Sequence, residues 1–408
     1  MTQLQSRTID IIKSTVPVLE IHGEAITKHF YKIMFKDHPE LLNIFNHAHQ
    51  KQGRQPKALA ASVYAAAKYI DNLEAIIPVV KQIAHKHRSL NVKPEHYPIV
   101  GKYLLIAIKD VLGDAATDEI MEAWEVAYGL IADVFISVEK DMYEEAENQV
   151  GGWKEFKSFI VSKKEKESDV ITSFYLKPKD GDKLASFQPG QYISVRVTIP
   201  NSEFTHIRQY SLSDSPTKDY YRISVKKEEE INEKPAGMVS NFLHSSINEG
   251  DELEITAPAG DFVLLDNVNQ PVVLLSGGVG LTPMVSMLNH LIEKKFEKDI
   301  FFIHATRNSE FHGMKDELSN IQEQNSNVNY FVCYDSPTEK DKLAKKYDKA
   351  GYIEKEWLRR ILPTEEAQYY FCGPAVFMKK LYKDLLDLGV NPSNIHYEFF
   401  GPAMDIEE

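Results

Sequence analysis

The period at which apolar residues recur changes twice along this chain of 408 residues, and that change constrains the fold most. Through residue 147, apolar residues recur every three or four positions, as they do on one face of a helix. A long helix is expected from about Thr117 to Glu147, and the sequence NQVGG (148–152) then interrupts the pattern. Residues 1–147 are therefore predicted to form an all-α domain.

The rest of the chain shows two further patterns. Between residues 153 and 265, short alternating runs such as QYISVRV, YRISVKK and DELEITA are separated by Pro, Gly and Asp turns, which predicts an antiparallel β-barrel. After Asn269, the apolar runs PVVLLS, DIFFIHAT, VNYFVCY and AQYYFCG alternate with helical stretches, which predicts a parallel α/β sheet. The predicted fold is multidomain, with an α/β domain at 270–408.

The composition excludes several classes of protein. Hydrophobic residues at 43% and charged residues at 26% are ordinary for a globular protein, whereas a net charge of -13 disfavours a nucleic-acid partner. Cys333 and Cys372 lack the spacing of a disulfide framework or a zinc site. Because no signal core and no long apolar segment occur, we expect a cytoplasmic, non-membrane protein. No obligatory protein partner is evident from the sequence.

One histidine in the helical region lies in phase with an apolar face. Val80, Ile83, Ala84 and His87 are spaced at i, i+3, i+4 and i+7, so they share one face of a helix. His85 lies about 200° away around the same helix. Periodicity thus selects His87 as the inward-facing histidine, although a lone inward histidine is more often a core residue than a metal ligand.

The segments HFYKIMFKDHPELLNIF, QKQGRQPKAL, IAHKH and KPEHYPIVGKYLL closely resemble the haem domain of the flavohaemoglobin (flavohaemoprotein) family, over most of residues 1–147. The resemblance implies a globin-like haem domain in which His87 is the axial iron ligand. It also implies that Phe45 packs on the porphyrin and that Tyr31, Gln55 and Leu59 form the distal pocket. Without the resemblance, Tyr31 would be read as an ordinary core tyrosine.

The same resemblance assigns Glu139 and Tyr97 as partners of the iron ligand. Glu139 follows Ile131 and Phe135 at helical spacing, so its carboxylate is expected near an apolar face, where isolation would be costly. A hydrogen bond from the His87 ring explains this position. An anionic partner makes the imidazole a stronger electron donor, which favours oxygen activation over oxygen storage.

The run RQYSLS (208–213) marks the predicted flavin site. On a strand, alternate residues share a face, so Arg208 and Tyr210 point the same way. The run resembles the R-x-Y-S signature of ferredoxin-reductase-like flavoproteins. The resemblance implies that Arg208 pairs with an FAD phosphate, Tyr210 packs on the isoalloxazine and Ser211 reaches its N5 edge, with Gln209 between them.

Two flanking runs strengthen the prediction of an FAD-binding domain at 153–265. PGQYISV (189–195) precedes RQYSLS and GMVSNFLH (237–244) follows it, in the order that the family shows. Gly237, Met238, Val239 and Ser240 would open a helix onto the pyrophosphate, where free N–H groups favour anions. Tyr192 is a further flavin candidate, and a core tyrosine of a strand is an equal alternative.

The α/β region holds two motifs for an NAD(P)H-binding domain. PVVLLSGGVGLTPMVSML predicts a strand, a glycine turn and a helix, with Thr282 as the capping residue and Pro283 at the first helical position. YYFCGP (369–374) resembles the family's C-G-P motif beside the nicotinamide. The binding residues predicted here are Gly277, Gly278, Val279, Gly280, Leu281, Thr282, Cys372, Gly373 and Pro374. A glycine turn that is only structural is the alternative.

The last predicted motif is HYEFFGP (396–402), which resembles the family segment whose aromatic residue shields the flavin. That residue would be Phe400, with Glu398 close by. The neighbouring Phe399, Gly401 and Pro402 complete the predicted site. A terminal strand with core phenylalanines is the simpler alternative.

Together, these motifs predict an electron-transfer enzyme with haem b (iron), FAD, and NADH or NADPH as cofactors. The resemblance implies nitric oxide dioxygenase activity, in which NAD(P)H reduces FAD, FAD reduces the haem iron, and O2 bound there converts nitric oxide to nitrate. A flavin is needed because a two-electron donor must feed a one-electron iron. Two alternatives remain: a reductase that acts mainly on O2 or peroxides, and an oxygen or redox sensor.

Overall fold

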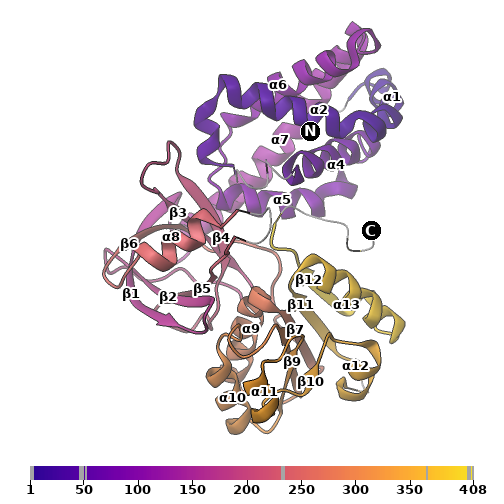
Figure 1. Ribbon diagram of the computed structural model, residues 1–408. Coiled ribbons are helices and arrows are strands. Elements are labelled where there is room, and N and C mark those ends of the chain that lie inside the picture. The colour runs from indigo at the N-terminus through magenta and orange to yellow at the C-terminus, as the bar shows by residue number, and fades with distance from the viewer. Residues whose placement is uncertain are drawn as a thin grey trace.

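The computed structural model describes residues 4–45, 50, 53–230, 235–363, 366–401 and 406. Figure 1 shows three lobes in chain order: a helical lobe at the N-terminus, a barrel of strands, and a lobe of strands between helices. The predicted fold class, with an all-α domain, an antiparallel barrel and a parallel α/β sheet, is confirmed. Among the described residues, no helix has both the length and the apolarity that a membrane span requires.

The helical lobe is built from long helices that pack in two groups. Its elements are α1 (Ser6–Ser14), α2 (Val16–Asp37), η1 (Pro39–Asn43), α4 (Arg54–Lys68), η2 (Leu73–Ile76), α5 (Ile77–Ser89), α6 (His96–Leu112), η3 (Gly113–Ala115) and α7 (Asp118–Asn148). α2 packs on α4 and α6, and α5 packs on α7. The Thr27 hydroxyl of α2 donates to the carbonyl of Pro56 in α4 (2.8 Å), which fixes the start of α4. The predicted distal residues thus lie on α2 and α4, whereas His87 lies on α5 and Glu139 lies on α7.

The middle lobe is a six-stranded antiparallel barrel. Its elements are β1 (Phe156–Lys166), β2 (Ile171–Pro178), β3 (Tyr192–Val197), β4 (His206–Ser211), β5 (Tyr221–Lys226), α8 (Met238–Ser246) and β6 (Glu252–Thr256). The strands run in the order β4-β3-β6-β1-β2-β5, and a bridge between Leu212 and Ile223 joins the two edges. Apolar residues such as Phe159, Phe174 and Ile193 fill the interior.

The third lobe is a parallel sheet with helices on both faces. Its elements are β7 (Val272–Gly277), η4 (Gly278–Gly280), α9 (Leu281–Glu293), β8 (Ile300–Thr306), α10 (Lys315–Gln324), β9 (Val328–Tyr334), α11 (Glu339–Ala344), β10 (Lys349–Ala350), α12 (Lys355–Ile361), β11 (Gln368–Cys372), α13 (Ala375–Asp387), η5 (Pro392–Asn394) and β12 (Ile395–Glu398). The strand order is β10-β9-β8-β7-β11-β12. The chain adds β8, β9 and β10 on one side of β7 and then returns to add β11 and β12 on the other side. Open α/β sheets bind ligands in the crevice at such a switch point.

Two junctions join the three lobes. The last turn of α5 lies against the barrel, and the chain that leaves β12 rises to the underside of the helical lobe (Figure 1), where Lys86 donates to the carbonyl of Gly401 (2.6 Å). On the other side of the barrel, Arg222 of β5 pairs with Glu317 of α10 (2.8 Å). The barrel is therefore the central body on which the other two lobes are fixed.

Candidate active site

The predicted iron ligand is held by two polar side chains. His87 Nδ1 lies 2.7 Å from Oε1 of Glu139 and 3.2 Å from the hydroxyl of Tyr97, which itself donates to Glu139 (2.6 Å). Glu139 is only 3% exposed. Because a carboxylate only accepts hydrogen bonds, the ring proton belongs on Nδ1, and the Nε2 lone pair is left free. Tyr128 donates to the carbonyl of Tyr97 (2.7 Å) and fixes this arrangement.

The surroundings of His87 fit a haem. The described residues offer no hydrogen-bond partner to Nε2, and the ring of Phe135 lies 5.9 Å from the imidazole. Several apolar side chains of this lobe are only half-buried although they belong to its core, as expected around a large apolar group: Phe45, Leu59, Val63, Tyr64, Ile99 and Phe135. No group of three or more His, Cys, Asp or Glu among the described residues could hold a metal without a porphyrin.

Tyr31 on α2 stands at the centre of the predicted distal group, and the other members of the group lie on α4. It is buried, with Phe45 edge-on at 5.7 Å and Phe35 stacked at 5.6 Å. Burial raises the pKa of its phenol, and the nearby side chains of Gln55 and Gln50 partly offset that effect. The hydroxyl therefore stays neutral and can donate. A cavity of about 420 Å³ opens here, lined by Lys28, Tyr31, Lys32, Phe35, Gln50, Gly53 and Pro56.

Gln50 and Lys86 are candidate residues that the sequence patterns did not single out. Gln50 lines the Tyr31 cavity, and its amide nitrogen is buried without a hydrogen-bond partner among the described residues. Lys86 reaches the C-terminal segment only because a distant part of the chain folds back onto α5. Neither contact follows from periodicity, so no local signal could have found them.

The flavin motif lies on β4, where Arg208 is a half-buried cation. It donates to the adjacent carbonyl of Ile207 (2.7 Å) and forms no ion pair with a described residue, and burial lowers its pKa. A half-buried guanidinium without an anionic partner among the described residues fits a phosphate ligand. Ser211 pairs with Tyr192 across β3 and β4, which places the two flavin candidates together. The Tyr192 hydroxyl is buried near Ser89 but makes no hydrogen bond of normal geometry.

We expect Arg208→Gln to weaken FAD binding because it removes the charge-assisted hydrogen bonds to a phosphate. Such bonds contribute about 1.5–3 kcal/mol, so the dissociation constant of FAD should rise roughly 10- to 100-fold. Flavin fluorescence after dilution measures the release. Arg196→Gln, on the neighbouring strand β3, is the control, since Arg196 already pairs with Glu254 (2.8 Å). Equal FAD affinity in the two variants would contradict the role of Arg208.

The predicted pyrophosphate helix is α8, which begins after Gly237. A Cβ at Gly237 would lie 2.7 Å from the Ser240 hydroxyl and 2.8 Å from Glu228, so only glycine fits. The Ser240 hydroxyl donates to the Gly237 carbonyl (3.2 Å) and accepts from the Glu228 amide (3.2 Å). Val239 is buried in the barrel core, whereas the side chain of Met238 is exposed. The start of this helix is thus rigidly attached to the barrel.

The two nicotinamide motifs meet at the switch point of the sheet. β7 and β11 are parallel neighbours, so the glycine turn and the C-G-P motif follow adjacent strand ends. A Cβ at Gly280 would lie 2.2 Å from the carbonyl of Cys372, and Gly278 has a φ of 55°. Burial raises the pKa of Cys372 well above its usual value, which argues against a nucleophilic thiolate. The backbone can therefore approach a dinucleotide closely here.

The predicted start of the helix after the glycine turn was wrong. Gly280 is the N-cap of α9, so Thr282 and Pro283 are its second and third residues, and the Thr282 hydroxyl donates to the carbonyl of Val279 (3.1 Å). The short turn η4 continues directly into α9, which moves the helix start two residues earlier. Pro283 has no amide N–H, and it is tolerated because the amides of the first turn of a helix have no carbonyl partner within the helix.

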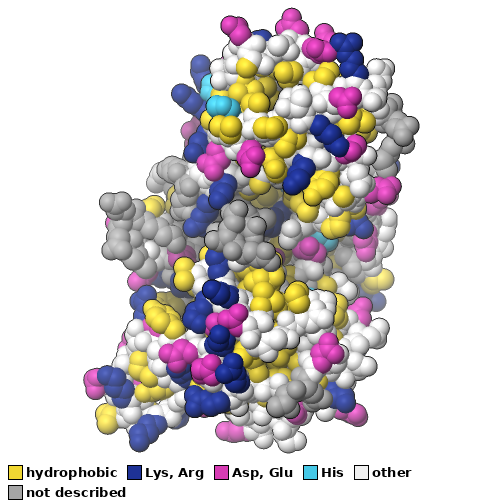
Figure 2. All heavy atoms as spheres, turned by 90° about the vertical axis from the view of Figure 1, so that its right-hand side faces the viewer, with side chains coloured by type: hydrophobic (Ala, Val, Ile, Leu, Met, Phe, Trp, Pro, Cys, Tyr) yellow, Lys and Arg dark blue, Asp and Glu magenta, His cyan; other side chains and the backbone are white. Residues whose placement is uncertain are grey.

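The surface of the α/β lobe also suits a dinucleotide. On the face in Figure 2, hydrophobic side chains lie beside Lys and Arg side chains over the lower lobe. Two of its most exposed apolar residues, Tyr352 and Val376, follow the carboxyl ends of β10 and β11. Arg307, after β8, is exposed with its guanidinium 4.6 Å from the ring of Phe311. The apolar side chains at this edge of the sheet suit the rings of such a ligand, and the cation suits its phosphates.

The C-terminal motif lies between the lobes. Glu398 pairs with Cys372 in the ladder between β11 and β12, and burial raises the pKa of its carboxyl to about 8, although Lys86 opposes this shift. One oxygen of this carboxyl is buried without a partner among the described residues. Phe400 is 45% exposed, and Phe399 packs edge-on against Tyr397. Gly401 accepts from Lys86, and Pro402 lies outside the described residues.

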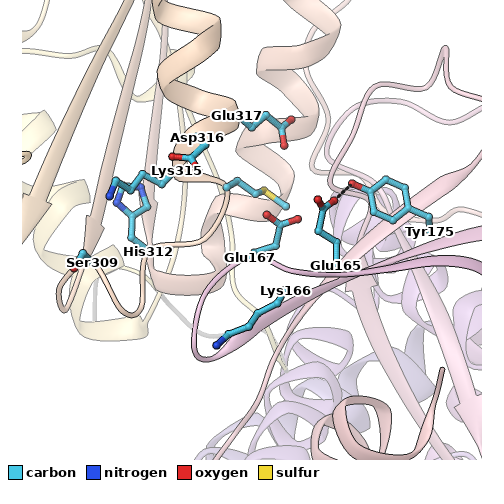
Figure 3. A pocket seen from close by; sticks show the side chains of 10 residues that line it. Glu165, Lys166, Glu167, Tyr175, Ser309, His312, Lys315, Asp316 and Glu317 are labelled. Atoms are coloured by element: carbon cyan, nitrogen blue, oxygen red, sulfur yellow. Dashed lines mark hydrogen bonds between the residues drawn. The ribbon is translucent and has the colours of Figure 1, made fainter. Parts of the chain in front are cut away.

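A second cavity lies away from these motifs. It has a volume of about 500 Å³ and lies between the hairpin of β1 and β2 on one side and, on the other, the segment before α10 with the first turn of that helix (Figure 3). Its lining is highly charged: Glu165, Lys166, Glu167, Tyr175, Ser309, His312, Met314, Lys315, Asp316 and Glu317. None of these residues belongs to a predicted motif. We therefore place the chemistry at the motifs and not at this cavity.

Comparison with protein families agrees with the three lobes. Residues 28–135 match the globin family, residues 158–264 match the oxidoreductase FAD-binding domain, and residues 274–383 match the oxidoreductase NAD-binding domain. The fold and the site thus define a flavin- and nicotinamide-dependent oxidoreductase joined to a globin domain, with haem, FAD and a nicotinamide dinucleotide as cofactors.

Full-length relatives narrow this class. The chain is 60% identical to the flavohaemoprotein of Halalkalibacterium halodurans over 98% of its length and 97% of the relative. It is 56% identical to the flavohaemoprotein of Bacillus subtilis, with 99% of both chains covered. The chain belongs to the flavohaemoprotein family.

Solved structures show the same architecture. The flavohaemoglobin of Malassezia yamatoensis, with bound FAD and haem, matches with a TM-score of 0.83 at 27% identity and covers 98% of this chain and all of that one. The FAD/NAD-binding domain of the nitric oxide dioxygenase of Vibrio cholerae matches with a TM-score of 0.55 at 38% identity, over 60% of this chain and 99% of that one.

Proposed function

We propose that the protein is a nitric oxide dioxygenase. In the balanced reaction, two molecules of nitric oxide and two of dioxygen, with one NAD(P)H, give two nitrate ions, one NAD(P)+ and one proton. The observation that carries the proposal is the buried Glu139, which holds the His87 ring at 2.7 Å. The nitric oxide dioxygenase of Vibrio cholerae, whose reductase part resembles this one, supports it. The cytoplasm, where NAD(P)H is available, is the compartment we propose.

Each cofactor supplies a distinct chemistry when bound: the nicotinamide gives an electron pair, the flavin passes electrons singly, and the haem iron is a one-electron centre for dioxygen. His87 would hold the iron through Nε2, and Phe45 would pack on the porphyrin. Glu139 and Tyr97 keep the imidazole proton on Nδ1 and make the ring electron-rich. This polarisation suits oxygen activation.

The distal residues would orient and stabilise the reacting ligands. Tyr31 is buried and neutral, so its hydroxyl can donate to a small ligand that carries partial negative charge. The side chains of Gln55 and Gln50 lie close enough to that hydroxyl to oppose the effect of burial on its pKa. Leu59, half-buried on α4, would limit the space for water. The Tyr31 hydroxyl would thus donate a hydrogen bond to the oxygen on which negative charge develops during nitrate formation.

The reductase residues would bind the two remaining cofactors. We assign the FAD site to Tyr192, Arg208, Gln209, Tyr210, Ser211, Gly237, Met238, Val239, Ser240, Glu398, Phe399, Phe400, Gly401 and Pro402. We assign the NAD(P)H site to Gly277, Gly278, Val279, Gly280, Leu281, Thr282, Cys372, Gly373 and Pro374. The β12 ladder joins the two groups, because Glu398 pairs with Cys372. The nicotinamide and the flavin would therefore meet at the end of β11.

The nitrate formed per NAD(P)H consumed tests the proposed function. With nitric oxide and dioxygen present, we expect two nitrate ions for each NAD(P)H, and much slower NAD(P)H consumption when nitric oxide is omitted. Consumption that is independent of nitric oxide, with little nitrate, would instead support a reductase that acts on O2 or peroxides. Ion chromatography of nitrate, together with absorbance of NAD(P)H, supplies both measurements.

Tyr31→Phe tests the distal part of the proposal, because it removes only the hydroxyl donor. Loss of one such donor costs about 10²- to 10³-fold in turnover, so nitrate formation should fall by that amount. Reduction of the flavin by NAD(P)H should keep its wild-type rate. Tyr69→Phe, at an exposed position of the same lobe, is the control. A nitrate rate in Tyr31→Phe equal to that of the control would rule out the donor role.

A further inference from the structure

The helix that carries the proposed iron ligand also contacts the reductase. Four residues in the last turn of α5 contact the reductase, and His87 lies among them. His85 Nδ1 accepts from the Gly260 amide (3.3 Å), Lys86 donates to Gly401 (2.6 Å), Arg88 donates to two carbonyls of the barrel, and Ser89 accepts from Gln209 (2.7 Å). Any movement of this turn would move the iron ligand relative to the flavin strand.

Arg88 is the more deeply buried of the two cations in this turn. It is only 7% exposed, and its guanidinium donates to the carbonyls of Ala257 (3.4 Å) and Pro258. It forms no ion pair with a described residue, although Glu145 acts on it at longer range. Burying a cation without an anionic partner is costly unless hydrogen bonds compensate. The two carbonyls must therefore stay in place for the buried charge to be tolerated.

Those carbonyls belong to a segment that is tied to the flavin strands. Directly after Pro258, Ala259 exchanges two backbone hydrogen bonds with Tyr192: the Tyr192 amide donates to Ala259 (2.9 Å), and the Ala259 amide donates to Tyr192 (2.8 Å). Tyr192 in turn pairs with Ser211 at the end of the R-x-Y-S run. A short path of covalent and hydrogen bonds thus connects the residue next to the iron ligand with the flavin site.

We propose that Arg88 is a positioning residue for electron transfer, which docks the last turn of α5 on the segment Ala257–Ala259 and so fixes the haem relative to the flavin. This inference rests on the proposed function, because it assumes that electrons pass from flavin to haem. Each electron that leaves the reduced flavin reduces one ferric iron to ferrous, and two transfers restore the oxidised flavin. Arg88 touches neither cofactor in this role.

The test uses the full chain loaded with haem and FAD. In Arg88→Met, stopped-flow absorbance should show flavin reduction by NAD(P)H at the wild-type rate and the following haem reduction slowed about ten-fold or more, as expected when reacting groups are misplaced by an ångström. Hydrogen exchange at the amides of Tyr192 and Ala259 should become faster. Lys81→Met removes an exposed cation from the same helix and should change neither quantity.

Haem reduction at the wild-type rate in Arg88→Met, or unchanged exchange at Tyr192 and Ala259, would overturn the proposal. If Arg88→Met does not retain both cofactors, Arg88→Gln replaces it, because that side chain keeps a donor but no charge. The same slowing and the same faster exchange are expected, and wild-type values again overturn it. A wild-type protein that passes no electrons to haem would refute the proposed function, whereas normal transfer in both proteins refutes only the role of Arg88.

Discussion

Replacing His87 with alanine is expected to leave the protein without haem while FAD stays bound. The imidazole Nε2 is the proposed bond from the protein to the iron, and Glu139 and Tyr97 orient it through Nδ1. Removing the ring eliminates that bond and leaves Glu139 with only the Tyr97 donor. The Soret band should disappear, whereas the flavin absorbance should remain because Arg208 and Tyr210 belong to another lobe.

A cavity variant separates loss of the ligand from loss of the fold. In His87→Gly, added imidazole can enter the space of the missing ring and donate a hydrogen bond to Glu139, which orients it. We expect it to restore the Soret band. His85→Ala is the matched control, since His85 lies on the same turn but accepts from Gly260 of the barrel. A normal Soret band in His87→Ala would exclude His87 as the ligand, and loss of the band in His85→Ala would point to His85 instead.

Helical phase predicted the orientation of His87 because it is a local property. Val80 and Ala84 are buried, and the His87 ring lies on the same side, where it reaches Glu139. The alternation of β4 and the order of the parallel strands follow from equally local patterns. Sequence alone thus indicated the fold class and the helix and strand on which the main candidate residues lie.

Contacts between lobes could not be predicted in the same way. Arg88 is one residue from His87, but its burial depends on carbonyls about 170 positions later in the chain. Gln50 lies before the start of α4 and lines the same cavity as Tyr31 of α2, and no periodic pattern records this contact between separate segments. The error at Thr282 has a related cause, since η4 continues into α9 and makes Gly280 the cap. Packing decides each of these features.

The second large effect is expected at the junction of the barrel with the α/β lobe. Arg222 is 4% exposed and pairs with both oxygens of Glu317 (2.8 and 3.1 Å), with Asp214 at 3.8 Å. Asn289 of α9 donates to Asp214 (2.9 Å) and to Glu317 (2.8 Å). The Ser286 hydroxyl of α9 donates to the Asp214 carbonyl (2.8 Å). This network holds α9, whose N-terminus carries the glycine turn, against the barrel.

Arg222→Met should destabilise the reductase by about 3–5 kcal/mol, because it leaves Asp214 buried without its cation and Glu317 without its bidentate partner. Denaturant unfolding followed by flavin fluorescence measures this loss. Arg196→Met is the matched control: its ion pair with Glu254 is also bidentate, but the Arg196 side chain is 32% exposed, so about 1 kcal/mol or less is expected. Replacing Arg222 and Glu317 together by methionine should lose less stability than Arg222→Met alone, since only Asp214 then lacks its cation. Equal losses in Arg222→Met and Arg196→Met would show that the junction does not depend on this network, and the position of the glycine turn would then have to be held by the apolar contacts of α9 alone.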